Sequence, residues 1–166
     1  MIDYKTWSKS KGEIEKLTNF LKEVDDDFLP PLSDTNFERL GTGKSLGEYL
    51  GKFPKKGLIY AEKNGKVTGL LGYFDYFEKY GTGFIENVSV LKSQRQHGIG
   101  SKMLEMAINT MKKTGIEKIT VRTWTTNAAS IRLYKKFGFN IKKTIHNDRG
   151  NGVGSIIFEK NIGEKK

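Results

Sequence analysis

The stretch that decides the fold is residues 84–111, which read FIENVSVLKSQRQHGIGSKMLEMAINTM. Its first residues, through Val90, are rich in apolar and β-branched side chains, a composition typical of a strand. After a loop, apolar residues return at helical spacing. They are Met103, Leu104, Ala107, Ile108 and Met111. The stretch therefore predicts a strand that runs through a glycine-containing loop into a long helix, which ends near Gly115.

The loop of this stretch carries Gly98 and Gly100 directly before the helix. The first turn of a helix presents free N–H groups and the positive end of the helix dipole, and both attract anions. Glycine lets the backbone approach a ligand closely. A plain strand-to-helix turn uses glycine equally often, so these residues alone fit either a diphosphate cradle or an ordinary turn.

Two other phosphate-binding motifs are excluded. The dinucleotide-binding pattern needs a third glycine, and Met103 stands at that position. Gly43-Lys44-Ser45 has the form of a P-loop end, but Glu38 stands where that motif needs its first glycine. We therefore interpret the segment Phe37–Gly43 as a loop.

The chain before residue 84 predicts helices followed by a hairpin. A short strand is expected from Ile2 to Trp7 and an amphipathic helix from Ile14 to Val24. A short helix is expected over Ser45–Leu50. Asn64-Gly65 is a strong hairpin signal, and it separates the strand Leu58–Ala61 from a second strand, Val67–Phe77. With the strand Phe84–Val90, which follows a turn at residues 81–83, these segments predict three consecutive antiparallel strands.

The chain after residue 115 predicts a strand, a helix and two further strands. The strand covers Lys118–Trp124, and the helix is capped by Asn127 and closed by Gly138. The last strands are Ile141–Ile145 and Val153–Phe158. The whole order is β-α-α-β-β-β-α-β-α-β-β, which predicts a mixed α/β (α+β) fold. We expect a mostly antiparallel central sheet of six to seven strands, flanked by about four helices, in a single domain over residues 1–166.

The composition limits the possible partners and sites. Twenty-nine Lys and Arg against 19 Asp and Glu give a net charge of +10, which favours an anionic partner. The absence of cysteine excludes disulfides and thiolate zinc sites, and two histidines, His97 and His146, are too few for a standard zinc site, so no metal is expected. The residues from Met1 to Lys5 do not resemble a signal peptide, and no apolar run could span a bilayer, so the expected location is cytoplasmic, without a membrane partner.

A second motif follows the first at residues 127–139 and reads NAASIRLYKKFGF. Together the two motifs resemble the GCN5-related N-acetyltransferase (GNAT) superfamily. Its cofactor motif is Arg/Gln-x-x-Gly-x-Gly/Ala after a Val-x-Val strand end, and its downstream motif is Asn-x-x-(Ala/Ser)-x-x-x-Tyr-x-x-x-Gly-Phe. The matching residues are Arg95, Gly98 and Gly100 in the first motif, and Asn127, Ser130, Tyr134, Gly138 and Phe139 in the second. The resemblance covers Phe84–Phe139, whereas residues 1–56 carry no family signature.

The resemblance implies a GNAT-like fold that binds acetyl-CoA as co-substrate. In the family, the strand at Val88–Val90 binds the pantetheine arm and the N–H groups of Gln96–Ser101 hold the pyrophosphate. Asn127 contacts the cofactor, caps the helix, or does both. The expected cofactor-binding residues are Val88, Ser89, Val90, Arg95, Gln96, His97, Gly98, Ile99, Gly100, Ser101, Asn127 and Ser130. Arg132, Lys135 and Lys136 either meet the adenosine phosphate or are simply solvated.

The resemblance also implies a catalytic role for Tyr134, and attack by an amine needs a base or a water relay. Tyr134 is expected to protonate the departing thiolate of coenzyme A, and the alternative is a core aromatic residue. Glu86 is the candidate base that takes a proton from the amine, because alternation places it on the same strand face as Val88 and Val90. Burial would raise the pKa of such a carboxyl group. An exposed strand carboxylate, with water as the relay, is an equal alternative.

The acceptor is expected to be a primary amine of a small molecule or peptide, attacked directly, in a monomer or homodimer. Asp25-Asp26-Asp27 is either an acidic rim for a cationic amine or a solvated helix end, and Tyr73 and Trp124 either line the acceptor slot or only pack. Arg122 stands where relatives that modify protein N-termini carry glutamate, which argues against a ribosomal-protein role. The alternatives are a non-catalytic acyl-CoA-binding protein and, less favoured because the lysines are scattered, a basic nucleic-acid-binding module.

Overall fold

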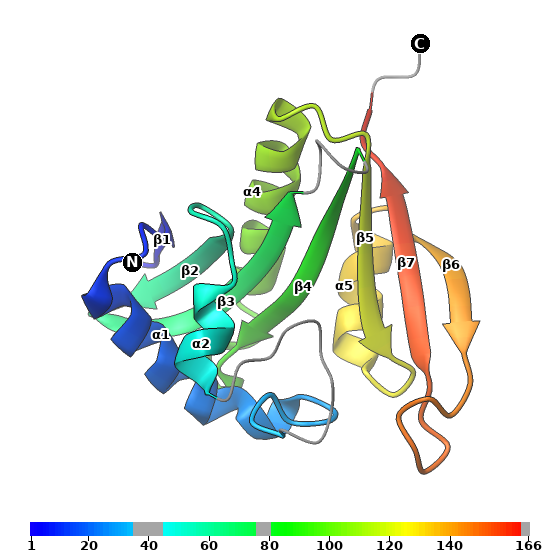
Figure 1. Ribbon diagram of the computed structural model, residues 1–166, viewed down its shortest axis with the longest axis horizontal. Helices are drawn as coiled ribbons and strands as arrows, with labels where there is room; N and C mark the ends of the chain where they lie inside the picture. Colours follow the sequence, from blue (N-terminus) through cyan, green and yellow to red (C-terminus); the bar gives the residue numbers. More distant parts are fainter. Residues whose placement is uncertain (35–44, 76–80, 164–166) are drawn as a thin grey trace. The chain divides into compact units, whose positions relative to one another are not determined.

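The computed structural model describes residues 1–34, 45–75 and 81–163. The predicted loop Phe37–Gly43 and the predicted strand end at Tyr76 and Phe77 lie outside these residues. Figure 1 traces the described elements along the chain. They are β1 (Asp3–Thr6), α1 (Lys11–Val24), the 3₁₀ turn η1 (Asp25–Asp27), α2 (Leu46–Gly51), β2 (Leu58–Lys63), β3 (Lys66–Asp75), β4 (Thr82–Val90), the 3₁₀ turn η2 (Lys92–Gln94), α4 (Ile99–Lys113), β5 (Lys118–Trp124), α5 (Ala128–Lys136), β6 (Asn140–Ile145) and β7 (Ser155–Asn161).

The described strands form a seven-stranded sheet in the order β1-β2-β3-β4-β5-β7-β6. The pairs β1/β2, β2/β3, β5/β7 and β6/β7 are antiparallel, and β4/β5 is parallel. This arrangement confirms the predicted mixed, mostly antiparallel sheet. The outer strands both carry lysines: Lys5 in β1, and Lys142 and Lys143 in β6.

Most predicted element types are confirmed, and the differences lie at strand ends. Asn64 and Gly65 both have positive φ, +50° and +78°, and join β2 to β3 as the predicted tight turn. The start of β7 was predicted wrongly, because it begins at Ser155 rather than Val153. A Cβ at Gly154 would collide with the carbonyl oxygen of Ile145, and the Gly154 N–H donates to Thr125 Oγ1 at 3.1 Å. Gly154 therefore belongs to the loop.

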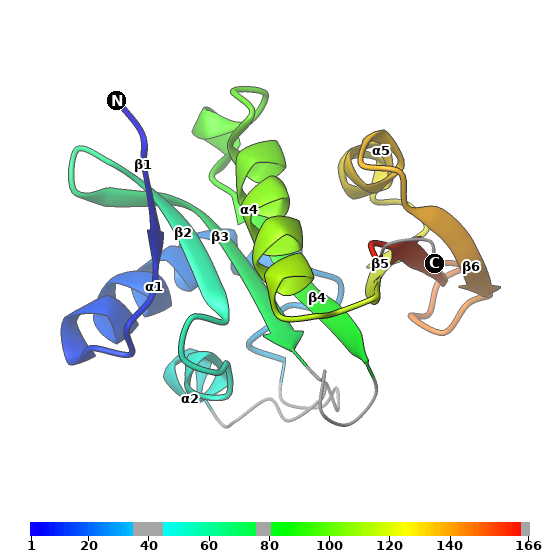
Figure 2. The same ribbon diagram turned by 90° about the horizontal axis from the view of Figure 1, so that it is seen from above.

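The described chain falls into two compact units. Unit 1 comprises Met1–Gly72 and Asn87–Met103, and unit 2 comprises Tyr73–Glu86 and Leu104–Lys166. In unit 1, α1 and α2 lie on one side of β2 and β3, and the first turn of α4 lies on the other (Figure 2). Apolar residues of these strands, among them Leu58, Leu70 and Leu71, are buried, and so are Leu17 and Leu21 of α1.

Two glycines of β3 bring the helices of unit 1 close to the sheet. A Cβ at Gly69 would lie 2.9 Å from Ile99 Cγ2 on α4, and a Cβ at Gly72 would lie 2.5 Å from Phe53 Cε1 behind α2. Neither distance leaves room for a side chain at these positions. The start of α4 is therefore held directly against β3, which places the preceding loop.

In unit 2, aromatic residues join α5 to the strands. The ring of Tyr134 lies 5.8 Å from that of Phe139 and 5.7 Å from that of Phe158 on β7, both at tilted angles. All three side chains are buried. Asn127 caps α5 by accepting the N–H of Ser130 at 3.1 Å, and Gly138 follows the helix with φ +75°, as predicted.

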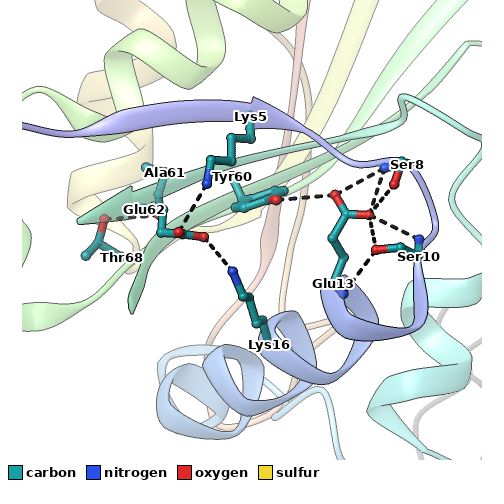
Figure 3. Close-up of polar contacts among 9 residues, drawn as sticks. All are labelled: Lys5, Ser8, Ser10, Glu13, Lys16, Tyr60, Ala61, Glu62 and Thr68. Atoms are coloured by element: carbon teal, nitrogen blue, oxygen red, sulfur yellow. Dashed lines mark hydrogen bonds and ion pairs between the residues drawn. The ribbon is translucent and has the colours of Figure 1, made fainter. Parts of the chain in front are cut away.

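A capping box at the start of α1 connects this helix to the sheet of unit 1. Figure 3 shows Glu13 accepting hydrogen bonds from Ser8 and Ser10, while the hydroxyl of Tyr60 on β2 donates to Glu13 Oε1 at 3.2 Å. Burial raises the pKa of Glu13, but the hydrogen bonds from Ser8 and Ser10 outweigh it and lower the pKa to about 2. Burial and the Glu13 charge raise the pKa of Tyr60 to about 12. The spacing Ser10-x-x-Glu13 is a sequence signal for this cap, although our sequence interpretation did not use it.

Two ion pairs beside this box also anchor the N-terminal segment. Lys5 Nζ lies 3.1 Å from Glu62 Oε1 and Lys16 Nζ lies 3.0 Å from Glu62 Oε2 (Figure 3). Hydrogen bonds from Lys16 and Lys5 lower the pKa of Glu62, which is buried on β2. Strand β1 and helix α1 are therefore both held to the same carboxylate.

We predict that Glu13→Gln reduces the pH dependence of unfolding. The lowered pKa means that the carboxylate stabilises the folded chain above pH 4.5, and that this contribution is lost as the pH falls from 4.5 towards 2. The substitution should cost about 1 kcal/mol at neutral pH and flatten the acid side of the stability curve. Urea unfolding between pH 2 and pH 7 measures both effects. Glu15→Gln, exposed on the same helix, is the control, and an equal change in both variants would contradict the prediction.

Candidate active site

The carboxyl half of β4 presents alternate side chains to different environments. Glu86, Val88 and Val90 are half-buried, whereas Asn87 and Ser89 are buried. The shared face predicted for Glu86, Val88 and Val90 agrees with this alternation. The amide of Asn87 accepts the N–H of Gly72 at 3.0 Å and donates to the hydroxyl of Tyr49 at 2.6 Å. Asn87 thus fixes β4 against β3 and α2, and sequence reasoning did not single it out.

The loop between β4 and α4 is anchored at both ends and exposed between them. Leu91 and Ile99 are buried, while residues from Lys92 to Gly98 are exposed except for the half-buried Gln94. Within the loop, Gln96 has φ +67° and Gly98 has φ +78°. A left-handed conformation costs a non-glycine residue such as Gln96 about 1–2 kcal/mol. The surrounding contacts therefore hold the loop in a shape that Gln96 would not adopt by itself.

The start of α4 leaves backbone donors without a partner in the helix. The first helical hydrogen bond at this end runs from the Lys102 N–H to the Gly98 carbonyl, at 2.9 Å. The N–H groups of Ile99, Gly100 and Ser101 therefore have no carbonyl one turn earlier to bind. A Cβ at Gly98 would meet nothing within 4 Å, so the space beside this backbone is open. Exposed N–H groups at the positive end of a helix suit an anion such as a diphosphate.

The side chain of Arg95 is engaged inside unit 1. Its Nε donates to the Val90 carbonyl at 3.0 Å, and its Nη2 forms an ion pair with Asp27 Oδ2 of η1 at 2.5 Å. Lys92 Nζ lies 3.3 Å from the other oxygen of Asp27. Sequence reasoning grouped Arg95 with the cofactor-binding residues and missed Asp27 as its partner, because nothing in the local sequence indicates a contact 68 residues away.

Two of the three acidic residues of η1, Asp25 and Asp27, have partners within unit 1. Asp25 accepts hydrogen bonds from the backbone and the hydroxyl of Ser33. Asp27 is paired with Arg95 and Lys92. These contacts favour the interpretation of η1 as an internally paired helix end over that of an open acidic rim.

Tyr134 is buried in unit 2 on the inner face of α5. Only 3% of the residue is exposed. Burial raises the pKa of its phenol, and a hydrogen bond with the Ser130 side chain one turn earlier opposes that rise. The phenol is therefore protonated at neutral pH, so it can donate a hydrogen bond. The two roles expected for Tyr134, core aromatic residue and proton donor, are compatible with this environment.

A polar network that sequence reasoning missed joins β5 to the β6–β7 loop. Arg122 forms an ion pair with Asp148, and Ser155 Oγ donates to Asp148 Oδ2 at 2.9 Å. Arg149 Nε donates to Ser155 Oγ at 2.9 Å, and the Arg149 guanidinium lies 5.5 Å from the ring centre of Trp124. Burial raises the pKa of Asp148, but hydrogen bonds from Ser155 and Arg122 lower it overall. The half-buried Trp124 therefore packs against the Arg149 guanidinium.

The expected site residues divide between the two units. Unit 1 contains the strand end Val88–Val90 and the loop residues from Arg95 to Ser101, including the exposed His97. Unit 2 contains Glu86, Asn127, Ser130 and Tyr134. Tyr73 is also in unit 2, where it is buried and hydrogen-bonded to the Thr110 side chain, an environment that fits a packing role.

Two other kinds of feature are absent from the described residues. Among residues 1–34, 45–75 and 81–163, no group of three or more histidine and carboxylate side chains is placed to hold a metal ion. In the same part of the chain, no helix has the length and apolar character needed to cross a bilayer.

Comparison with protein families gives one match that covers most of the chain. The family described as "Acetyltransferase (GNAT) family" matches residues 17–139. This range includes both motifs, the strand β4 and the start of α4. It also includes α1 from Leu17 onward, in the part of the chain where the sequence shows no readable signature.

Curated relatives match shorter stretches. The chain is 37% identical over 62 residues to GCN5-related N-acetyltransferase 6 of Arabidopsis thaliana, which covers 37% of this chain and 22% of that protein. It is 29% identical to N-alpha-acetyltransferase 30 of Schizosaccharomyces pombe, over 46% of this chain and 51% of that one. It is also 29% identical to the L-methionine sulfoximine/L-methionine sulfone acetyltransferase of Salmonella typhimurium, over 51% and 50%. The matches thus span about half the length of these relatives or less.

Solved structures share the fold over the full chain. An acetyltransferase of the GNAT family from Streptococcus pneumoniae has a TM-score of 0.79 at 22% identity, covering 98% of this chain and all of that one. The protein yncA of Salmonella typhimurium, described with its cofactor acetyl-CoA, has a TM-score of 0.73 at 20% identity, with coverage of 99% and 95%. At these identities the likeness establishes the fold.

We predict that Gly98→Ala and Gly12→Ala have opposite effects on stability, although both positions have open space around a new Cβ. Gly98 has φ +78°, so alanine there should cost about 1 kcal/mol, or a melting temperature about 2–4 °C lower. Gly12 lies in α1, where alanine is favoured over glycine. Thermal unfolding of both variants measures the difference. A melting temperature that falls equally in both would show that the left-handed backbone at Gly98 is not required.

Proposed function

The chain belongs to the acetyltransferase (GNAT) family, and we propose that it transfers the acetyl group of acetyl-CoA to a primary amine of a small molecule or peptide. The observation that carries this proposal is the turn before α4. It leaves backbone N–H groups without a helical partner beside an open glycine, at the position where the family motif places the pyrophosphate. The net charge of +10 supports a polyanionic cofactor.

We propose that backbone groups provide most of the cofactor binding. The strand end Val88–Val90 is assigned to the pantetheine arm, and the N–H groups from Gln96 to Ser101 are assigned to the pyrophosphate. Such donors need no side chain, which explains why glycine is acceptable at positions 98 and 100. Asn127 already accepts a hydrogen bond as the cap of α5, so any cofactor contact would use the rest of its amide. Exposed Arg132, Lys135 and Lys136 on α5 are the candidates for the adenosine phosphate.

The proposed reaction is direct acyl transfer without a covalent enzyme intermediate. The amine nitrogen attacks the thioester carbonyl, a C–N bond forms, the C–S bond breaks, and coenzyme A leaves as a thiolate. Overall, the amine loses a proton and the thiolate gains one. We assign the first proton to Glu86 or to water, and the second to Tyr134. The half-buried position of Glu86 allows either a direct contact or a water relay.

The environment of Tyr134 specifies how it would assist the leaving group. Because burial raises its pKa, the phenol is protonated and ready to donate at neutral pH. A thiol has a pKa of about 8.5, whereas an ordinary phenol has a pKa of about 10. Tyr134 is therefore the weaker acid, and we expect its hydrogen bond to the departing sulfur to supply most of the stabilisation.

The acceptor is proposed only as an amine class. One relative is named as an N-alpha-acetyltransferase and another as an acetyltransferase of methionine sulfoximine and methionine sulfone. These names support both a peptide and a small-molecule acceptor. We also propose that residues 1–166 act as one catalytic domain.

We predict that acetyl-CoA stabilises the folded chain. At 100 times Kd, a ligand that binds only the folded state adds about 2.7 kcal/mol, or about 5–10 °C in melting temperature. Thermal unfolding with acetyl-CoA and with CoA measures this shift. A folded sample that responds to neither ligand would contradict the proposed function. A thiol-release assay over polyamines, aminoglycosides, amino acids and peptides then separates an enzyme from a protein that only binds acyl-CoA.

We predict that Tyr134→Phe lowers kcat by about 100-fold or more, the usual effect of removing a proton donor, and leaves the Kd of acetyl-CoA within about threefold. Steady-state kinetics and binding measurements on the folded variant test both parts. Tyr60→Phe is the matched control, because Tyr60 is also a buried tyrosine whose hydroxyl forms a hydrogen bond, and it should retain full turnover. A Tyr134→Phe variant with wild-type kcat would remove the proton-donor role.

A further inference from the structure

The loop before α4 lacks the buried side chains that usually fix a loop. Its residues from Lys92 to Gly98 are exposed except for the half-buried Gln94. The backbone contributes the hydrogen bonds from the Gln94 N–H to the Leu91 carbonyl, at 2.8 Å, and from the Arg95 N–H to the Lys92 carbonyl, at 3.4 Å. These bonds close the 3₁₀ turn η2, but they do not connect it to the rest of unit 1.

Side-chain contacts make that connection: Gln94 Oε1 accepts a long hydrogen bond from Lys63 Nζ at 3.5 Å, and Arg95 and Lys92 bind Asp27. The planar guanidinium of Arg95 binds in two directions, with Nε on the Val90 carbonyl at the end of β4 and Nη2 on Asp27 of η1. Lys92, at the start of η2, reaches the second oxygen of Asp27. A single carboxylate therefore binds the first residue of η2 and the residue directly before Gln96. We call this set, Asp27, Lys92 and Arg95, the Asp27 clasp.

The charge of the clasp is consistent with a diphosphate nearby. Asp27 alone would repel an anion at the start of α4, but two cations and one carboxylate sum to +1. The side chain of Asp27 is 23% exposed and that of Arg95 is 44% exposed, so this ion pair is shielded from water on one side only. A bound anion would be attracted by the remaining positive charge while the carboxylate keeps both cations in place.

We propose that Asp27 is a positioning residue for acetyl-CoA, acting through Arg95 and Lys92 to hold the loop in the shape that directs its N–H groups towards the pyrophosphate. Arg95 then acts through the backbone that it fixes, and Asp27 touches no reacting atom. This inference rests on the proposed function, since it assigns the ligand of the loop as acetyl-CoA. It adds a residue from η1, which lies outside both sequence motifs.

The alternative role for Arg95 predicts the opposite result for Asp27. If Arg95 were a direct cation for the phosphates, Asp27 would compete with the cofactor for it. Removing the carboxylate would then free the guanidinium and tighten binding. If the Asp27 clasp positions the loop, removing the carboxylate weakens binding. The sign of the change in the Kd of acetyl-CoA therefore separates the two roles.

The experiment compares five proteins by calorimetric titration with acetyl-CoA: the wild type, Asp27→Asn, Asp27→Glu, Arg95→Lys and Glu23→Gln. We expect Asp27→Asn to raise the Kd about tenfold, the order expected for loss of a hydrogen bond to a charged group. Asp27→Glu should recover part of the loss. Arg95→Lys should also raise the Kd, because lysine keeps the charge but cannot bind Val90 and Asp27 together in this geometry.

Glu23→Gln is the matched control, because it removes a carboxylate of α1 that pairs with Lys66 at 3.0 Å, and its Kd should equal that of the wild type. With an amine found by thiol release, Asp27→Asn should raise the KM for acetyl-CoA and leave kcat within about twofold, a split that general destabilisation would not produce. Should Asp27→Asn fail to fold, Asp27→Glu carries the same test, because a weakened Asp27 clasp should still raise the Kd, whereas a lower Kd would favour the direct role for Arg95.

An unchanged or lower Kd in Asp27→Asn would overturn the positioning role while the proposed function stands. A wild-type protein that is folded but does not bind acetyl-CoA would overturn the proposed function, and this inference with it.

Discussion

The turn from β4 into α4 is held by a buried side chain at each end, while most of the chain between these two anchors is exposed. Leu91 and Ile99 fix its ends, and Gly69 allows Ile99 and Met103 to pack directly on β3. Between the anchors the chain buries little, and residues 96–98 are exposed. If the anchors were absent, the helix would start elsewhere and its free donors would point elsewhere. The packing of α4 on β3 therefore determines where the free N–H groups at the start of the helix lie in unit 1.

Local patterns predicted most elements, because each of them has a short-range physical cause. Asn64-Gly65 adopts the positive φ values of a tight hairpin, and Asn127 and Gly138 bound α5 as a cap and a stop. Long-range contacts were not predictable in this way. The partner of Arg95, the amide of Asn87 that binds Gly72, and the network around Asp148 each join segments far apart in the sequence. For the candidate site, the sequence indicated the residues of both motifs, but it did not indicate how Arg95 or Tyr134 are engaged.

Tyr134 and Glu86, the two residues assigned to proton transfer in the proposed reaction, differ in burial. The buried Tyr134 is held in its neutral form, which suits a donor. Glu86 stands at a half-buried position of β4, where water can reach it. In the proposed reaction, the buried donor would assist the departing thiolate, and the partly hydrated carboxylate would take the proton of the amine. These two environments would suit different steps of the proposed reaction.

The outer strands of the sheet have a consequence beyond catalysis. Strand β6 is exposed along almost its whole length and carries Lys142 and Lys143, while β1 at the other margin carries Lys5. A strand from another molecule that docked on either margin would have to strip water from these ammonium groups. Charged margins of this kind discourage the edge-to-edge growth that leads to fibrils. The lysines thereby oppose aggregation when the protein is concentrated.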